Sequence, residues 1–241
     1  MPPRAPLHPA ARDANAFGPG TIPRDLALRP PMSTAERYTP PWATLACWTV
    51  AVLAIAAGAA AACPDGACRA PAADRWLLGA FHAARQPWLD AFFAAFTWLG
   101  SIVVLLPASL ALGWAWRRRG DRSSAWRLPL AVGGAWLLAH AGKLLVTRPR
   151  PDLHAPVISM PADLSFPSSH AMVAAAFAVA LALSPRPRPS STVVAAAALA
   201  ALVVALSRMY LQVHYPSDVV AGAVAGTAWA LGLFLLPGVR R

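Results

Sequence analysis

Three short segments of this chain combine basic residues with histidine and serine. They are KLLVTRPRP from Lys143, FPSSH ending at His170, and SRMYLQVHYPSD from Ser207, and each lies at the end of an apolar run. Charged groups and histidines at the mouth of a membrane bundle usually mark a ligand or proton site. Fixed positive charge, a nucleophile and an acid are together suited to a phosphate ester. We therefore interpret the chain first as an enzyme.

The segment SRMYLQVHYPSD contains a candidate nucleophile. His214 lies in a tight connection between two apolar runs, and Pro216 is expected to open the next helix, with Asp218 in its first turn. An aspartate that accepts from one ring nitrogen fixes the tautomer and leaves the other nitrogen free to attack. Asp218 alone would also suit a helix N-terminus electrostatically. Its combination with Arg208 and His214 favours the catalytic interpretation.

The segment FPSSH predicts a helix start. Pro167 suits the first helical position, because its missing N–H would be unpaired there. The N–H groups of Ser168, Ser169 and His170 would then point free and form an anion site. His170 can protonate a leaving oxygen, since imidazole titrates near neutral pH. A serine-rich helix cap with an interfacial histidine is the alternative for this segment alone.

The segment KLLVTRPRP contains candidate phosphate contacts. Lys143 precedes Arg150 by about two helical turns, and Pro149 prevents the helix from continuing. Lysine can extend towards water, while arginine offers a planar fork to phosphate oxygens. Ordinary interfacial anchoring is the alternative. Arg148 and Arg150 both precede proline, so the residues alone leave open which one is the primary contact.

Together the segments resemble the signature of the type 2 phosphatidic acid phosphatase superfamily, which is related to bacterial acid phosphatases and vanadium haloperoxidases. Its pattern is K-x6-R-P, then P-S-G-H, then S-R-x5-H-x3-D, and the resemblance covers roughly residues 75–237. The spacing from Lys143 selects Arg150 over Arg148, and Ser169 stands in place of the usual glycine. The matching positions are Lys143, Arg150, Pro151, Pro167, Ser168, His170, Ser207, Arg208, His214 and Asp218.

The resemblance implies a role for each position. His214 would form a phosphohistidine, Asp218 would orient it, and His170 would protonate the leaving alcohol and then help to activate water. The phosphoryl oxygens would be held by Lys143, Arg150, Ser168, Ser169 and Arg208. No metal and no other cofactor is expected, because three cations can stabilise the transferring phosphoryl group. Vanadium haloperoxidase chemistry is less favoured in a small chain with six spans.

Composition places these segments in a membrane protein. Hydrophobic residues make up 57% and charged residues 13% of the chain, against roughly 45–50% apolar residues in a soluble domain. A net charge of +11 would suggest a nucleic-acid partner in a soluble protein. Here aromatic and charged residues are not interleaved on a polar surface, so we expect a lipid bilayer and no nucleic acid.

Six apolar runs are long enough, or nearly so, to cross a bilayer as helices. We therefore predict an all-α integral membrane bundle of about six transmembrane helices, with the active site at the outer-face helix ends. The second run is too long for one upright span, so its opening portion is expected at the interface. The fourth is adequate only if its helix begins near Pro167. The runs are 42–63, 91–116, 128–147, 171–184, 190–207 and 219–238.

Loop charges predict the orientation, because Lys and Arg concentrate in cytoplasmic loops. Arginines are numerous before residue 38, at 117–127, at 186–188 and at 240–241, and sparser in the alternate loops. We therefore expect cytoplasmic N- and C-termini in a bacterial inner membrane. The three chemical segments would then share the outer face.

The same patterns divide the chain. Residues 1–41 read as a disordered, proline-rich cytoplasmic tail, 42–74 as the first anchor and outer loop, 75–237 as the phosphatase-like helical domain, and 238–241 as a basic tail. Cys63 and Cys68 flank a predicted turn, and a local disulfide and two free thiols are equally compatible with it.

A site at the membrane surface predicts a lipid phosphate substrate. Phosphatidate, phosphatidylglycerophosphate and polyprenyl diphosphate all place a headgroup at the cations while their chains stay in lipid. A lipid phosphotransferase with an alcohol acceptor is one alternative. A non-catalytic membrane protein that binds lipid phosphates is the other, and the sequence does not specify the oligomeric state.

Overall fold

The computed structural model describes residues 40–184 and 188–236, and within these ranges it is helical and contains no strand. Of the tail predicted at 1–41, residues 1–39 lie outside the described residues and Pro41 is the first residue of α2, while the tail predicted at 238–241 lies entirely outside them. The helices are α2 (Pro41–Ala62), η1 (Pro64–Gly66), α3 (Ala72–Ala83), α4 (Pro87–Phe96), η2 (Thr97–Gly100), α5 (Ile102–Arg118), α6 (Arg122–Val146), α7 (Ser169–Ala182), α8 (Ser191–Tyr210) and α9 (Pro216–Leu235).

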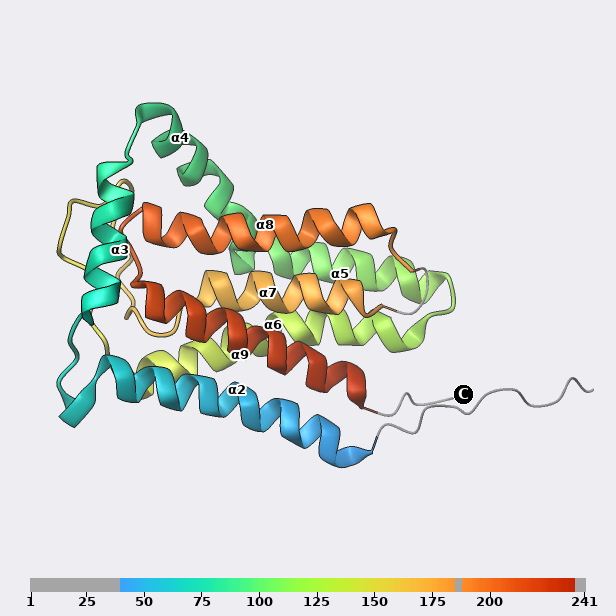
Figure 1. Cartoon of the computed structure of the whole chain (residues 1–241). Helices are drawn as coiled ribbons and strands as arrows, with labels where there is room; N and C mark the ends of the chain where they lie inside the picture. The colour runs from blue at the N-terminus through green and yellow to red at the C-terminus, as the bar shows by residue number, and fades with distance from the viewer. Residues whose placement is uncertain (1–39, 185–187, 237–241) are drawn as a thin grey trace, which may run out of the picture. The chain divides into compact units, whose positions relative to one another are not determined.

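Helix α7 occupies the centre of the bundle and packs against α6, α8 and α9, while α2 lies along α9 and α5 along α6 (Figure 1). Small residues let these helices approach closely. A Cβ atom added to Gly226 of α9 would collide with the carbonyl group of Met172, and one added to Gly222 would lie 2.6 Å from the Ser168 carbonyl oxygen. The start of α7 is therefore held tightly against α9.

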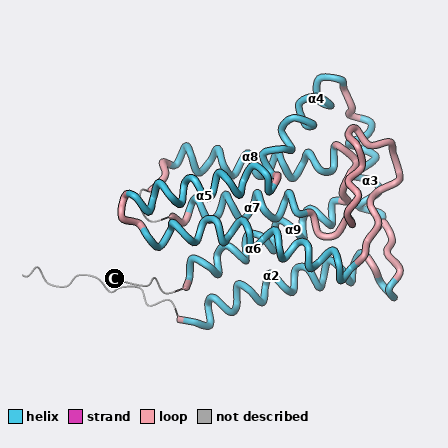
Figure 2. Tube along the Cα trace, turned by 180° about the vertical axis from the view of Figure 1, so that it is seen from behind, coloured by secondary structure: helices cyan, strands magenta, loops and turns pink. Residues whose placement is uncertain are grey.

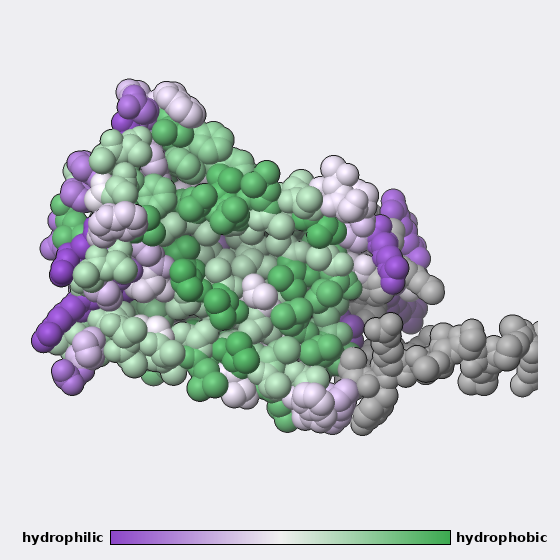
Figure 3. All heavy atoms as spheres, viewed as in Figure 1, coloured by the Kyte–Doolittle hydropathy of each residue, from purple (hydrophilic) through white to green (hydrophobic). Residues whose placement is uncertain are grey.

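The surface of the bundle is apolar in its middle. Figure 3 shows hydrophobic residues over the middle of one face and hydrophilic residues gathered at its two ends. Large side chains such as Leu53, Val103 and Leu145 are exposed. Exposure of this apolar surface to water would cost free energy, so the surface is suited to contact with lipid.

All six predicted apolar runs form helices among the described residues, but not every one of these helices is long enough to cross a membrane. Four helices are long and apolar enough to cross a membrane (α2, Ala125–Val146 of α6, α8 and α9), and α4–η2 with α5 forms a fifth, bent by 47°. The bend confirms that the long second run is not one upright helix. Ser101 begins α5 by accepting a hydrogen bond from the Val103 N–H at 3.3 Å.

Helix α7 has 14 residues and starts at Ser169, with Ser168 as its N-cap. The helix therefore begins two residues after Pro167, and the prediction that Pro167 is its first helical residue was wrong. Ser168 instead donates its N–H to the Asp218 carbonyl oxygen at 3.1 Å, so the preceding segment is bound to the start of α9 and does not extend α7.

The described residues belong to one compact unit, and the boundary predicted between residues 74 and 75 falls inside α3. None of the six apolar runs covers this helix. Cys63 and Cys68 are joined in a disulfide before α3, which decides between the two alternatives. Figure 2 shows that the long loops gather with α3 at one end of the bundle, and this end contains the candidate site.

Candidate active site

The connection between α8 and α9 positions His214. Helix α8 ends at Tyr210, Gln212 adopts a positive φ of 61°, and Pro216 opens α9. The His214 N–H donates to the Arg208 carbonyl oxygen at 3.2 Å, which closes a tight turn. As a result the imidazole is buried, with a relative exposure of 1%.

The two nitrogens of the His214 ring face different partners. Nε2 lies 3.1 Å from Nη1 of Arg150, and Nδ1 lies 3.5 Å from Oδ2 of Asp218. A guanidinium can only donate hydrogen bonds, so Nε2 must be the acceptor in this contact. In the neutral ring the proton is then on Nδ1, towards the carboxylate. The lone pair of a nucleophile is thus directed away from Asp218 and towards the cations.

Asp218 is fully buried and held from several sides. Its Oδ2 accepts from Ser165 Oγ at 2.5 Å and from the Tyr215 N–H at 3.0 Å, and its Oδ1 accepts from Arg148 Nη1 at 2.5 Å. The carboxylate therefore caps α9 and faces His214 at once. The two readings of Asp218 as a helix cap and as an orienting group are compatible in this geometry.

The three predicted cations come from three elements at the same end. Lys143 near the end of α6 and Arg208 near the end of α8 are buried, and the Arg150 side chain is 8% exposed. Arg208 donates from Nη1 to Thr97 Oγ1 at 2.7 Å. Lys143 and Arg150 both contact Asp163, a residue that sequence reasoning did not select.

The start of α7 faces this cluster. Ser168 is buried, and its Oγ has no hydrogen-bond partner among the described residues. His170 lies within electrostatic range of Arg150, Lys143 and Arg208. The expectation that three N–H groups point free was wrong for Ser168, whose N–H is used by Asp218.

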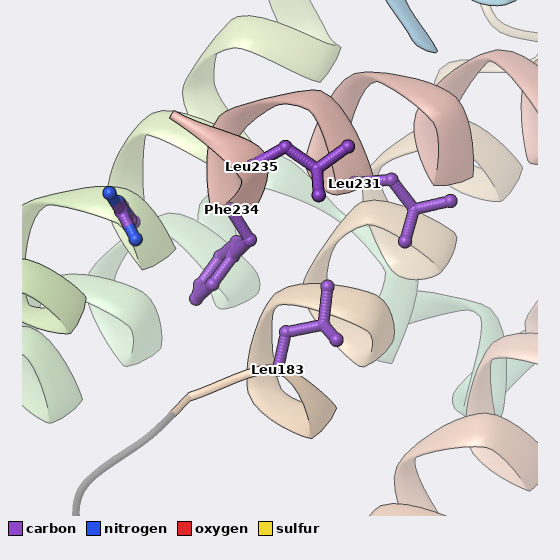
Figure 4. A pocket seen from close by; sticks show the side chains of 5 residues that line it. Leu183, Leu231, Phe234 and Leu235 are labelled. Carbon is purple, nitrogen blue, oxygen red and sulfur yellow. The ribbon is translucent and has the colours of Figure 1, made fainter. Parts of the chain in front are cut away.

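A separate pocket lies at the other ends of α6, α7 and α9. Arg127, Leu183, Leu231, Phe234 and Leu235 line it (Figure 4). Its one charged side chain, Arg127, donates to the Leu236 carbonyl oxygen at 2.5 Å. Since Lys143 lies at the opposite end of α6 from Arg127, this pocket is distinct from the histidine site.

Comparison with known families and proteins identifies the family of this chain. The model of the PAP2 superfamily matches residues 124–241, which include all eight candidate site residues. Phosphatidylglycerophosphatase B of Bacillus subtilis (strain 168) is 32% identical over 160 residues, which cover 63% of this chain and 73% of that protein. The chain belongs to the PAP2 superfamily. This bears out the family resemblance of the three segments.

Other members of the PAP2 superfamily agree with this result. Decaprenylphosphoryl-5-phosphoribose phosphatase of Mycobacterium tuberculosis is 34% identical over 148 residues, covering 52% of this chain and 79% of that protein. The crystal structure of a transmembrane PAP2-type phosphatidylglycerolphosphate phosphatase from Bacillus subtilis superposes with a TM-score of 0.66 at 30% identity, covering 78% of this chain and 92% of that one. LpxE of Aquifex aeolicus gives a TM-score of 0.55 at 29% identity, covering 66% and 92%. This PAP2 member is therefore an integral membrane protein and a phosphoric ester hydrolase.

Sequence reasoning missed the buried ion pairs that hold Asp218 in this PAP2 site. Arg148 is buried and pairs with Asp218 and with Asp74 of α3, whose Oδ2 lies 3.0 Å from Nη2. Asp74 also accepts from the Ser217 N–H at 2.9 Å. The two arginines of the Arg-Pro pairs thus have different partners: Arg148 contacts the Asp218 carboxylate, and Arg150 contacts the His214 ring. No sequence motif indicated Asp74.

The pH dependence of the PAP2 reaction follows from the burial of His214. Burial first, and then the nearby charges of Arg150, Arg208 and Lys143, lower the pKa of His214 well below its ordinary value of 6.5. The nucleophilic role predicted for His214 requires a neutral ring, and for that role we expect the acid limb of kcat/KM to have its midpoint below pH 6.5. A pH profile of kcat/KM measures this, and a midpoint at or above 6.5 would contradict it. The same shift makes the fold less stable as the pH falls below 6.5, because the unfolded ring then binds a proton more readily than the folded one.

Proposed function

We propose that this protein hydrolyses lipid phosphates through a phosphohistidine on His214. The contact that carries the proposal is the one between Arg150 Nη1 and His214 Nε2, with Asp218 on the opposite side of the ring. It directs the lone pair of a buried imidazole towards a group of cations. Such an arrangement is suited to attack on a phosphorus atom and has no obvious use as a structural contact.

The reaction would have two steps. Nε2 of His214 bonds to phosphorus while the bond from phosphorus to the ester oxygen breaks, and His170 gives its proton to the departing alcohol. Water then attacks the phosphohistidine, His170 takes a proton from it, and inorganic phosphate leaves with His214 restored. Asp218 holds the Nδ1 proton and stabilises the charged ring in the first step.

The proposed phosphate cradle combines charges with unpaired donors. Lys143, Arg150 and Arg208 would hold the phosphoryl oxygens, helped by Ser168 and by the N–H of Ser169. Among the described residues, Ser168 Oγ and Arg208 Nε are buried without a hydrogen-bond partner. Buried polar groups usually have partners, so two orphaned donors at one site are consistent with an anion that binds there.

The position of the site and the substrates of the relatives support the proposed substrate class. The cations lie at one end of an apolar bundle, where a headgroup can reach them while its chains stay in lipid. The similar proteins named above are phosphatases of phosphatidylglycerophosphate and of decaprenylphosphoryl-5-phosphoribose. We infer that phosphatidate, phosphatidylglycerophosphate or polyprenyl diphosphate is the natural class of substrate.

The proposed location is the inner membrane of a bacterium, with the site on the outer face. The positions of the described arginines support the assignment of the site to the outer face. Helix α5 ends with Arg117 and Arg118, followed by Arg119, at the end of the bundle opposite to the connection between α8 and α9 (Figure 1). A concentration of arginine is typical of the cytoplasmic side. Both chain termini would then be cytoplasmic.

Activity is expected to persist in EDTA, because the cations provide the charge stabilisation that a metal would otherwise supply. In the part of the chain that the structure describes, no three His, Cys, Asp or Glu side chains are grouped to hold a metal ion. Phosphate release from a panel of lipid phosphates and diphosphates in detergent micelles, with and without EDTA, measures this. Vanadate, a mimic of five-coordinate phosphorus, should inhibit the reaction.

Complete loss of activity on chelation would contradict the metal-independent mechanism. Addition of an alcohol separates hydrolysis from the phosphotransferase alternative, since a transferase would form a new phosphate ester in proportion to the acceptor. Tight binding of lipid phosphate without any release would instead indicate a binding protein.

A further inference from the structure

Asp163 lies in the loop between α6 and α7 and contacts two of the three cations. Its Oδ1 lies 2.5 Å from Arg150 Nη2, and its Oδ2 lies 3.3 Å from Lys143 Nζ. The Asp163 carbonyl oxygen also accepts from Arg150 Nε at 2.8 Å, and Lys143 donates to the carbonyl oxygen of Leu164. A carboxylate is thus bound by the groups that would bind a phosphoryl group.

The Arg150 guanidinium also contacts the proposed nucleophile, His214. While Nη2 and Nε of Arg150 bind Asp163, its Nη1 contacts the Val213 carbonyl oxygen at 2.6 Å and His214 Nε2 at 3.1 Å. The lone pair that must attack phosphorus is therefore occupied by a hydrogen bond in this state. Arg150 has to turn from Nε2 towards the phosphoryl oxygens before the reaction can begin.

We propose that Asp163 is a resting-state latch, a carboxylate that occupies the anion position between Lys143 and Arg150 and holds Arg150 over His214 until the phosphoryl group of a substrate displaces it. This inference rests on the proposed function of the site. It makes Asp163 a positioning residue that acts through Arg150.

The exposure of Asp163 makes displacement feasible. Its side chain is 42% exposed, whereas that of Asp218 is fully buried. Only the carboxylate side of these pairs faces water, because the Lys143 and Arg150 side chains are 4% and 8% exposed, and a phosphate with more charge and three free oxygens makes stronger bonds to the two cations. The Asp163 side chain can therefore move into the solvent, while the Asp218 side chain stays buried.

The latch stays charged across the working pH range. Burial alone would raise the pKa of Asp163, but Lys143 and Arg150 together lower it from 3.8 to about 2. Protonation would open the latch only near that value. Substrate, and not mild acid, is then the agent that releases Arg150.

The test is the affinity for inorganic phosphate, measured by calorimetry on the full chain in detergent micelles. Asp163→Asn removes the charge at nearly constant shape and should bind phosphate about threefold tighter or more. Asp152→Asn, an exposed aspartate in the same loop, is the matched control and should bind within about twofold of the parent. In assays of lipid phosphate hydrolysis, Asp163→Asn should lower KM and the inhibition constant of phosphate together, with kcat little changed.

Unchanged or weaker phosphate binding by Asp163→Asn would overturn the latch. If Asp163 only positions the cations for catalysis, the variant should bind phosphate more weakly and lose kcat/KM. Asp163→Ser, which also removes the charge, provides the same comparison if the asparagine variant does not fold. Absence of phosphate binding in the parent and in both variants also overturns the proposal.

Calorimetry separates this result from the proposed function. If the parent binds phosphate but releases none from any lipid phosphate, the hydrolytic mechanism fails. The ratio of the phosphate affinities of Asp163→Asn and the parent then still tests whether Asp163 acts as a latch. If the parent hydrolyses lipid phosphate and the affinities do not differ, the latch alone fails.

Discussion

His214→Ala should lose phosphate release by a factor on the order of 10³ or more. The substitution removes the atom that bonds to phosphorus, and the remaining cations can only bind the ester. Purified parent and variant are compared for phosphate release in micelles with EDTA present. The parent should also acquire an acid-labile, base-stable phosphate at His214 when it is quenched during turnover.

His154→Ala is the matched control, because His154 lies in the loop at the same end of the bundle and stacks on His82 with ring centroids 4.1 Å apart. It should retain activity within a few-fold of the parent. Equal release by the parent and by His214→Ala would eliminate the histidine mechanism. Loss in both variants would point to a change in the loop as a whole.

Arg148→Met should destabilise the fold by about 3–5 kcal/mol, or a fall of about 10 °C or more in the unfolding midpoint. The reason is that Asp74 and Asp218 would both remain buried without the guanidinium that pairs with them. Thermal unfolding in detergent, followed by tryptophan fluorescence, measures this effect. Arg148→Lys should recover only part of the stability, because one ammonium group cannot reproduce the two-sided contact.

Arg150→Met provides the contrast two residues away. It should reduce phosphate release by a factor of about 10² to 10³, while the free energy of unfolding falls by only about 1–2 kcal/mol. A second comparison, Arg148→Met with Asp74→Asn, should regain part of the lost stability, since one buried charge is removed. Similar stability losses for the two arginines would contradict the division of roles between them.

The family and the helical class could be predicted from the sequence. The apolar runs report directly on transfer to lipid, and the spacing of Lys143, Arg150, His214 and Asp218 is a local property of the chain. That spacing also selected Arg150 over Arg148, and the structure places Arg150 beside His214. The roles of these residues stay predictions until the substitutions above are made.

Helix boundaries near the site depended on contacts distant in sequence. Pro167 is a good first residue for a helix by local criteria, but Ser168 donates its N–H to Asp218, a residue of another helix. The local preference was overridden by one hydrogen bond between segments. The same applies to the length of α7, which is shorter than a spanning helix because its start is bound to α9.

The sequence by itself therefore determined the membrane class, the set of candidate reactive side chains and their order along the chain, because apolar runs and motif spacing are local. Only the tertiary structure decided which partners those side chains have. Asp74 reaches Arg148 across 74 residues, and Asp163 reaches Lys143 from a loop without regular structure. No periodicity or motif encodes such pairs, since each depends on how the helix ends converge and on which charges must be compensated when they are buried.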